Sequence, residues 1–248
     1  MVDYFNSFCH HIGLEISGII HVGAHECEER DTYIELFRQS DKSILWVEAL
    51  PDVVDEIKQK YTDINILQAC IGATNEEEST FFVSNYSQCA GCLPFSQKHK
   101  ETFSSILQEE CKVKKTTLDT LISKADKPLR NMLVVSVNGA ELQVLKGAET
   151  LLEFIDFVVV RFETLQFHDG GATIYELRDW MGMNGFKQVE SVKVNEHSDA
   201  ILFISMNADY ELKKQEKQMS DQFQLMIEQY NQKNNTNITT QVYNDLEE

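Results

Sequence analysis

One segment, residues 131–147, constrains the fold more than any other part of the sequence. It starts with an apolar run from Met132 to Val137, broken only by Ser136, which is typical of a strand buried on both faces. Apolar residues then recur at helical spacing from Ala140 to Leu152, and Gly139 stands at the joint. A buried strand that leads directly into a helix is the repeating unit of a parallel sheet. The segment therefore predicts an α/β fold.

The same order of strand and helix recurs along most of the chain, which predicts a doubly wound, mostly parallel sheet. We expect strands at 18–22, 44–47, 64–71, 132–137 and 157–162, a closing antiparallel pair at 186–194 and 200–205, and helices at 28–37, from Pro51 to Tyr61, 116–122, 140–152 and 173–183. Residues 72–115 are less regular: 81–83 can form a strand, and 84–100 reads as a loop. These elements give one domain at residues 1–206.

The tail, residues 207–248, has a different pattern. Apolar residues such as Leu212, Phe223 and Tyr230 fall at helical spacing among Lys, Glu and Gln, and the sequence becomes rich in Asn and Thr from residue 231. An amphipathic helix of this kind usually packs on its own domain, and this is the outcome we expect. The alternative is that residues 209–230 bind a protein partner.

Composition excludes several classes of function. The net charge of the 248 residues is −18, and an acidic surface repels phosphate backbones, so we expect no broad nucleic-acid binding. No run of 18 apolar residues occurs and the first residues do not resemble a signal peptide, so we expect no membrane association and a cytoplasmic, intracellular location. The six cysteines are scattered, which favours reduced thiols over a disulfide framework.

Two strand ends carry residues suited to a nucleoside cofactor. Gly23, Ala24 and His25 follow the first strand, where glycine lets a backbone approach a ligand closely. Glu48 follows the second strand, 25 residues after Gly23, and an acid at about this separation can accept hydrogen bonds from both ribose hydroxyls. The alternative is that the glycine serves packing and that Glu48 is merely solvated.

The cysteines at 89 and 92 form a C-x-x-C motif that suggests either redox or metal chemistry. A redox pair normally follows an early strand and opens a helix, whereas this motif lies in an irregular stretch. A structural zinc site needs two more ligands, which Cys9, His10 and His11 could supply only if the fold brings them close. We therefore expect no metal.

Several motifs resemble, in the same order, those of the FkbM family of S-adenosylmethionine (SAM) dependent methyltransferases. They lie at 23–29, 46–51, 117–121, 137–148 and 199–200, and the resemblance covers about residues 15–206. It implies a Rossmann-like class I methyltransferase fold with a seven-stranded, mostly parallel sheet. It also implies SAM near Gly23, Ala24, His25, Glu48 and Ala69, and methyl transfer to a hydroxyl group, often on a sugar.

The sequence departs from the family pattern near the predicted pocket. Ser136 stands where the family has an aspartate, Asn138 replaces a Glu or Gln, and Arg161 lies where an acid is expected. A serine run of the family is replaced by residues 89–92, while His99 remains in a matching place. An aspartate at a strand tip can orient the methyl donor or accept a proton, and serine carries no charge at neutral pH, so neither role transfers to Ser136.

Two hypotheses follow. In the first, another base has taken over: His99, or His168 with Asp169, or Glu163 reaching into the pocket. The protein is then an active SAM-dependent O-methyltransferase that acts on a sugar or another small hydroxylated acceptor. In the second hypothesis, transfer activity is reduced or lost, and SAM binding is either kept or lost as well. The fold then serves to bind a ligand or a partner. The cluster of departures, Ser136 included, favours the second hypothesis, and the first remains the alternative.

Overall fold

The computed structural model describes residues 5, 8, 16–123 and 130–234. The chain divides into two compact units, residues 1–206 and 207–248, and each is described by itself.

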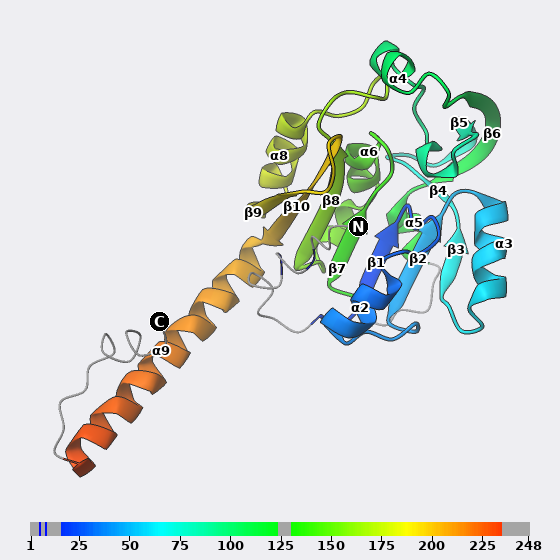
Figure 1. The fold of residues 1–248 in the computed structure, drawn as a ribbon. Coiled ribbons are helices and arrows are strands. Elements are labelled where there is room, and N and C mark those ends of the chain that lie inside the picture. Colours follow the sequence, from blue (N-terminus) through cyan, green and yellow to red (C-terminus); the bar gives the residue numbers. More distant parts are fainter. Residues whose placement is uncertain (1–4, 6–7, 9–15, 124–129, 235–248) are drawn as a thin grey trace. The chain divides into compact units, whose positions relative to one another are not determined.

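The first unit is built on a seven-stranded sheet (Figure 1). The strands follow the spatial order β3 (Ile66–Gln68), β2 (Ile44–Glu48), β1 (Ile19–Val22), β7 (Met132–Val135), β8 (Phe157–Glu163), β10 (Ser198–Ser205) and β9 (Phe186–Lys193). Neighbours from β3 to β8 pair in parallel, while β10 is antiparallel to both β8 and β9. The predicted Rossmann-like, mostly parallel sheet of seven strands is confirmed.

Alternation along the short strand β1 places side chains on both faces of the sheet. Ile20 and Val22 belong to an apolar core that includes Leu145 and Leu177 of the covering helices. These helices are α5 (Leu118–Ser123), α6 (Glu141–Lys146), α7 (Glu149–Leu152) and α8 (Ile174–Met183). Burial on both faces explains why the strands read as continuous apolar runs.

His21 points to the opposite face, where an aromatic cluster forms. Tyr33 of α2 (Arg30–Phe37) stacks on Trp46 of β2, with ring centroids 5.4 Å apart, and its hydroxyl is 2.9 Å from Nδ1 of His21. Burial of the imidazole lowers the pKa of His21 to about 3, so this histidine is a neutral core residue. Helix α3 (Pro51–Lys60) starts at Pro51 as predicted.

The helix predicted at residues 140–152 is in fact two helices, α6 and α7, which meet at Gly147. A Cβ atom on Gly147 would lie 2.1 Å from the carbonyl oxygen of Gly72, so only glycine permits this close approach of two backbones. The Asp119 carboxylate then accepts hydrogen bonds from the backbone N–H groups of Thr150 and Leu151 at the start of α7. The prediction failed because the break depends on a tertiary contact.

After β3 the chain continues into a second sheet of three strands. Their spatial order is β4 (Cys70–Ile71), β6 (Gln108–Thr116) and β5 (Glu76–Ser84). The single strand predicted at 64–71 is therefore divided between two sheets at Ala69. Strand β6 was missed because its residues are mostly charged, and its lysines pair across the strands, as in Lys114 with Glu77.

The predicted loop at 84–100 is partly helical. It contains the short 3-10 helix η1 (Ser87–Cys89) and the start of α4 (Gln97–Thr102), whose N-cap Ser96 accepts a hydrogen bond from the His99 N–H.

In the second unit, the predicted tail helix is present and longer than expected: α9 spans Met206–Asn234. None of the helices in the described ranges combines the length and the apolar character that a membrane span requires.

Candidate active site

Two adjoining cavities lie beyond the carboxyl ends of β1, β2, β7 and β8, where α/β sheets bind their ligands. The first cavity, about 410 Å³, is lined by residues that include Gly23, His25, Glu48, Ala69 and Cys70. The second, about 460 Å³, is lined by residues that include His99, Glu141, Glu163, His168, His197 and Ser198. Both cavities share the residues Gln88, Ser136, Asn138, Arg161 and Asn195.

Gly23 has a backbone φ of +83°, and a Cβ atom there would lie 1.9 Å from the carbonyl oxygen of Ser136. Only glycine therefore allows the ends of β1 and β7 to approach this closely beside the first cavity. Of the three residues predicted after β1, Gly23 and His25 line the cavity. Ala24 is buried beneath it, and its N–H donates to the carbonyl oxygen of Val47.

The Glu48 carboxylate is held at the end of β2 by three backbone donors. Oε1 accepts hydrogen bonds from the N–H groups of Ala49 (2.7 Å) and Leu50 (2.9 Å), and Oε2 accepts one from His25 (2.8 Å). An ionised carboxylate has about four acceptor positions, so one remains for a ligand hydroxyl. Glu48 is therefore a fixed, buried charge in the cavity wall and not a freely solvated side chain.

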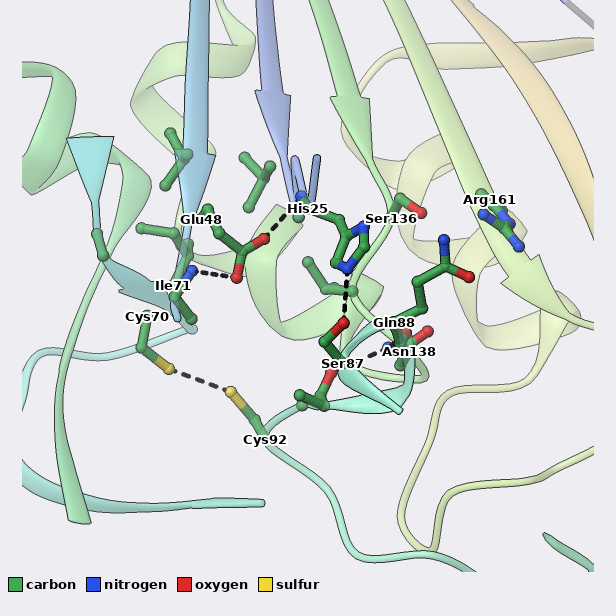
Figure 2. Close-up of a pocket in the computed structure, with 18 of the residues that line it drawn as sticks. His25, Glu48, Cys70, Ile71, Ser87, Gln88, Cys92, Ser136, Asn138 and Arg161 are labelled. Carbon is green, nitrogen blue, oxygen red and sulfur yellow. Dashed lines mark hydrogen bonds between the residues drawn. The ribbon is translucent and has the colours of Figure 1, made fainter. Parts of the chain in front are cut away.

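His25 connects the turn after β1 to the loop that holds η1 (Figure 2). Its Nδ1 lies 2.9 Å from Oε1 of Glu28, and its Nε2 lies 2.9 Å from Oγ of Ser87. The hydrogen bond to Glu28 raises the pKa of His25. Gln88 also donates to Glu28, so the η1 loop is tied to this turn at two points.

Asn138 ties the same loop to the end of β7 (Figure 2). Its Nδ2 donates to the carbonyl oxygens of Gln88 (2.7 Å) and Ala90 (2.9 Å), and its φ of +56° is one that asparagine tolerates. A glutamate or glutamine at this position would be longer, and glutamate has no N–H to donate. The substitution at Asn138 therefore has a structural role: it fixes the loop over the first cavity.

The two cysteines of the C-x-x-C motif face different cavities, and the partner of Cys92 is Cys70. The Sγ atoms of Cys70 and Cys92 are 3.2 Å apart and both residues line the first cavity, while Cys89 lines the second. The contact lowers the pKa of the Cys92 thiol and raises that of Cys70. All three are free thiols in the structure.

We expect mild oxidation by hydrogen peroxide to join Cys70 to Cys92 and not Cys89 to Cys92. Each thiol loses one hydrogen to the peroxide, giving a disulfide and two waters. The sulfurs need to approach by only about 1 Å to reach the bond length of about 2.05 Å. Peptide mapping by mass spectrometry should find the 70–92 cross-link in the wild type and in Cys89→Ser, but not in Cys70→Ser. A dominant 89–92 cross-link would contradict this arrangement.

In the second cavity, His168 is paired with Glu163, and its side chain is 3% exposed. Nδ1 of His168 lies 2.6 Å from Oε1 of Glu163, and the other carboxylate oxygen accepts the N–H of Phe167. Because an ionised carboxylate can only accept, Nδ1 donates to Glu163, and in the neutral imidazole the lone pair is then on Nε2. Nε2 is buried and has no hydrogen-bond partner among the described residues. The predicted pairing of His168 with Asp169 is wrong: Asp169 is exposed, since it lies on the other side of the turn.

His99 reaches the same cavity from α4. Its ring stacks on Phe95 with centroids 3.6 Å apart, and its centroid lies 6.0 Å from that of His168. Backbone hydrogen bonds between residues 94–96 and 167–169 bring these two distant segments together. Burial and the nearby His168 lower the pKa of His99. Among the described residues no carboxylate is hydrogen-bonded to the His99 ring, whereas His168 is oriented by Glu163.

Glu141, at the start of α6, is a buried acid in the second cavity that sequence reasoning missed. Its Oε1 accepts a hydrogen bond from the Gly139 N–H, yet burial raises its pKa to about 7. An acid in the first turn of a helix normally reads as a solvated partner of the helix dipole. Nothing in the local sequence distinguishes the buried case.

The raised pKa of Glu141 predicts a pH-dependent stability. Between about pH 4.5 and 7 the folded chain holds a proton that the unfolded chain has released, so stability from this group falls as pH rises through that window. The expected loss of stability across that window is about 3 kcal/mol. Urea unfolding at pH 5, 6, 7 and 8 measures the free energy of unfolding. This free energy should decline less with rising pH in Glu141→Gln than in the wild type. Glu149→Gln, at an exposed position, is the charge-matched control and should keep the wild-type slope.

Ser136 and Arg161 lie in the wall between the two cavities. β7 ends at Val135, one residue before Ser136, and Arg161 is in the last part of β8. No metal cluster of three or more His, Cys, Asp or Glu side chains occurs in the described part of the chain. The three residues considered as extra zinc ligands, Cys9, His10 and His11, lie outside it.

Comparison with known proteins decides the family. A family model described as the methyltransferase FkbM domain matches residues 21–188, more than half of the chain. The chain belongs to the FkbM methyltransferase family. The matched range includes the turn at Gly23, the Glu48 carboxylate, Ser136 and the pair of Glu163 with His168. The resemblance inferred from the sequence motifs is confirmed.

No curated protein is a significant sequence match to this chain. Solved methyltransferase structures are similar at low identity. The ribosomal protein L11 methylase of Lactobacillus delbrueckii subsp. bulgaricus is 9% identical with a TM-score of 0.45, over 81% of this chain and 75% of that one. The SAM-bound magnesium protoporphyrin IX methyltransferase of Synechocystis PCC 6803 is 8% identical with a TM-score of 0.45, over 82% and 77%.

Proposed function

We propose that this member of the FkbM family is an active SAM-dependent O-methyltransferase acting on a small hydroxylated acceptor. This is the alternative of the two hypotheses drawn from the sequence. The observation that favours it is the pair formed by His168 and Glu163, which gives the second cavity an oriented base where Ser136 cannot serve. A protein that had lost transfer activity would have no need to keep a buried imidazole nitrogen unpaired beside the cavity, because such an atom costs stability.

The first cavity fits a nucleoside cofactor. Glu48 offers a fixed negative charge with one acceptor position left for a ribose hydroxyl. Gly23 has no side chain, so a ligand can approach the backbone there. Ala49, Ala69 and Ile71 add an apolar wall at the same end. SAM would supply an electrophilic methyl group on a sulfonium sulfur. The residues of this chain would hold it at Glu48 and direct the methyl group past Ser136 towards the second cavity.

In the second cavity the chain's own groups supply the proton chemistry. The acceptor hydroxyl would give its proton to Nε2 of His168, and SAM would supply the methyl group to that oxygen and leave as S-adenosylhomocysteine (SAH). Glu163 holds the Nδ1 hydrogen and stabilises the imidazolium that results. Glu163 is thus a positioning residue and His168 the base.

The lining of the second cavity favours a hydroxylated acceptor. Nδ1 of His99, Nδ1 of His197 and Oγ of Ser198 are buried atoms without hydrogen-bond partners among the described residues. Buried polar atoms of native proteins normally find partners, so these three are available to the hydroxyl groups of a bound molecule. A cavity of about 460 Å³ is within the usual size range for small-molecule sites.

The proposal is tested in two steps. Calorimetry should show binding of SAH at micromolar to millimolar concentration. The protein is then incubated with SAM carrying a labelled methyl group and a panel of sugars, sugar nucleotides and small alcohols, and transfer is followed by product mass. Absence of SAH binding would overturn the proposal.

Binding of SAH without transfer to any member of the panel would instead support the second hypothesis, a ligand-binding module without transfer activity. The observation that favours this candidate is Ser136, which replaces the family's aspartate next to the site of transfer.

A further inference from the structure

Arg161 is the feature of the site that the proposed reaction does not use. It lines both cavities, and among the described residues no other lysine or arginine lines either of them. It projects from β8 at the end of the first cavity away from Glu48 and the two cysteines (Figure 2). Opposite it, on β10, lies Ala200, which has no polar atom in its side chain.

The guanidinium of Arg161 makes no hydrogen bond and no ion pair with the described residues, although acids line the same cavities. Two of those acids are engaged elsewhere: Glu163 with His168, and Glu28 with His25 and Gln88. Glu29 is close enough to be influenced by Arg161, but burial and Glu28 raise its pKa to about 7, so its charge is weakened.

The guanidinium of Arg161 has five N–H donors that face the cavities and no acceptor among the described residues, so these donors are available to a ligand. Its planar fork matches the two oxygens of a carboxylate or phosphate. The position is also one where the family pattern places an acid, so the charge at this point of the wall is reversed relative to that pattern.

We propose that Arg161 binds the anionic group, a carboxylate or phosphate, of the molecule that occupies the junction between the two cavities. This inference rests on the proposed function. The anion has two sources: the amino-acid carboxylate of the cofactor, or an acidic group on the acceptor, such as that of a uronic acid or a sugar phosphate. The chemistry is the same in both cases, and the ligand probes below separate them.

The first probe is inorganic sulfate, which tests for an anion site without requiring cofactor or turnover. At low millimolar concentration, where the general stabilising effect of sulfate is small, thermal unfolding of the wild type should be shifted upwards by sulfate more than by sodium chloride of equal ionic strength. Arg161→Gln should lose this preference, and Arg161→Lys should keep part of it. Lys187→Gln, on β9 and outside both cavities, is the charge-matched control and should respond like the wild type.

The second probe is a pair of cofactor fragments measured by calorimetry. SAH carries the amino-acid carboxylate, and 5′-methylthioadenosine lacks it. If Arg161 binds the cofactor, Arg161→Gln should weaken the affinity for SAH by about tenfold to a hundredfold. The affinity for 5′-methylthioadenosine should be unchanged. If it binds the acceptor, both affinities should be unchanged. In that case the KM for glucuronate or glucose 6-phosphate should rise about tenfold or more in the variant, with no change for glucose.

A wild type without preference for sulfate, together with unchanged SAH binding in Arg161→Gln, would overturn the inference. Failure of this inference can be distinguished from failure of the proposed function. If the wild type does not bind SAH, the methyltransferase proposal falls, while a sulfate effect that depends on Arg161 would still establish the anion site.

Discussion

Replacing His168 by asparagine is expected to slow methyl transfer by about 10²- to 10⁴-fold, the usual contribution of a general base. Asparagine can keep the hydrogen bond to Glu163 in the place of Nδ1, but it has no nitrogen that can accept a proton in the place of Nε2. The rate of the chemical step should therefore fall while the affinity for SAH stays the same. Single-turnover kinetics with labelled SAM measure the rate, and calorimetry with SAH measures the affinity.

Glu163→Gln should also slow methyl transfer strongly, by up to about 10⁴-fold. The amide oxygen is needed to accept the Phe167 N–H, so the amide NH2 group faces Nδ1 and favours the tautomer with the hydrogen on Nε2, which cannot act as a base. Asp169→Asn is the matched control, since Asp169 is the exposed chain neighbour, and it should behave like the wild type. Full activity in His168→Asn would show that the base is elsewhere, with Glu141 and His99 the remaining candidates in the same cavity.

Replacing Glu48 by glutamine is expected to weaken SAH binding by about tenfold to a hundredfold, because a charged hydrogen bond to a ribose hydroxyl is lost. The variant should also unfold more easily, by about 1 to 3 kcal/mol, since the amide group that replaces one oxygen cannot accept the backbone N–H it faces. Calorimetry with SAH and urea unfolding measure the two effects separately.

Glu26→Gln removes the same charge from an exposed position on the turn after β1 and should leave both quantities near the wild-type values. Lowered stability with unchanged SAH affinity in Glu48→Gln would mean that Glu48 only holds the backbone turns around it. That result would remove the main support for a ribose site in the first cavity.

The main sheet could be predicted from the sequence because its strands are buried on both faces. Runs such as Phe157–Val160 have no plausible place outside a covered sheet. The three-stranded sheet could not be predicted in the same way. β6 lies at the surface and is stabilised by cross-strand pairs such as Lys115 with Glu76, so its residues show no run of apolar character.

Part of the candidate site could be predicted from the sequence. The errors concern which side chains contact each other more than which residues line the cavities. Glu48 and His168 were both identified, but Asp169 was taken as the partner of His168 because it is the next residue in the chain. Adjacent residues in a turn point in different directions, and the turn instead brings back Glu163, whose second oxygen is held by the Phe167 N–H. Cys70 was missed as the partner of Cys92 because the contact joins β4 to the loop between η1 and α4 and leaves no local pattern in the sequence.

The stretch of chain from Gly72 to Thr116 lies outside the seven-stranded sheet but forms part of the walls of both cavities. Its strand β6 pairs with β5 and β4, and the stretch supplies the η1 loop over the first cavity and His99 in the second. Side chains on its inner surface can change without altering the packing of the seven-stranded core. We therefore expect that substitutions within this stretch, about one sixth of the chain, can change the walls of both cavities while the seven-stranded sheet and the residues around Glu48 stay the same.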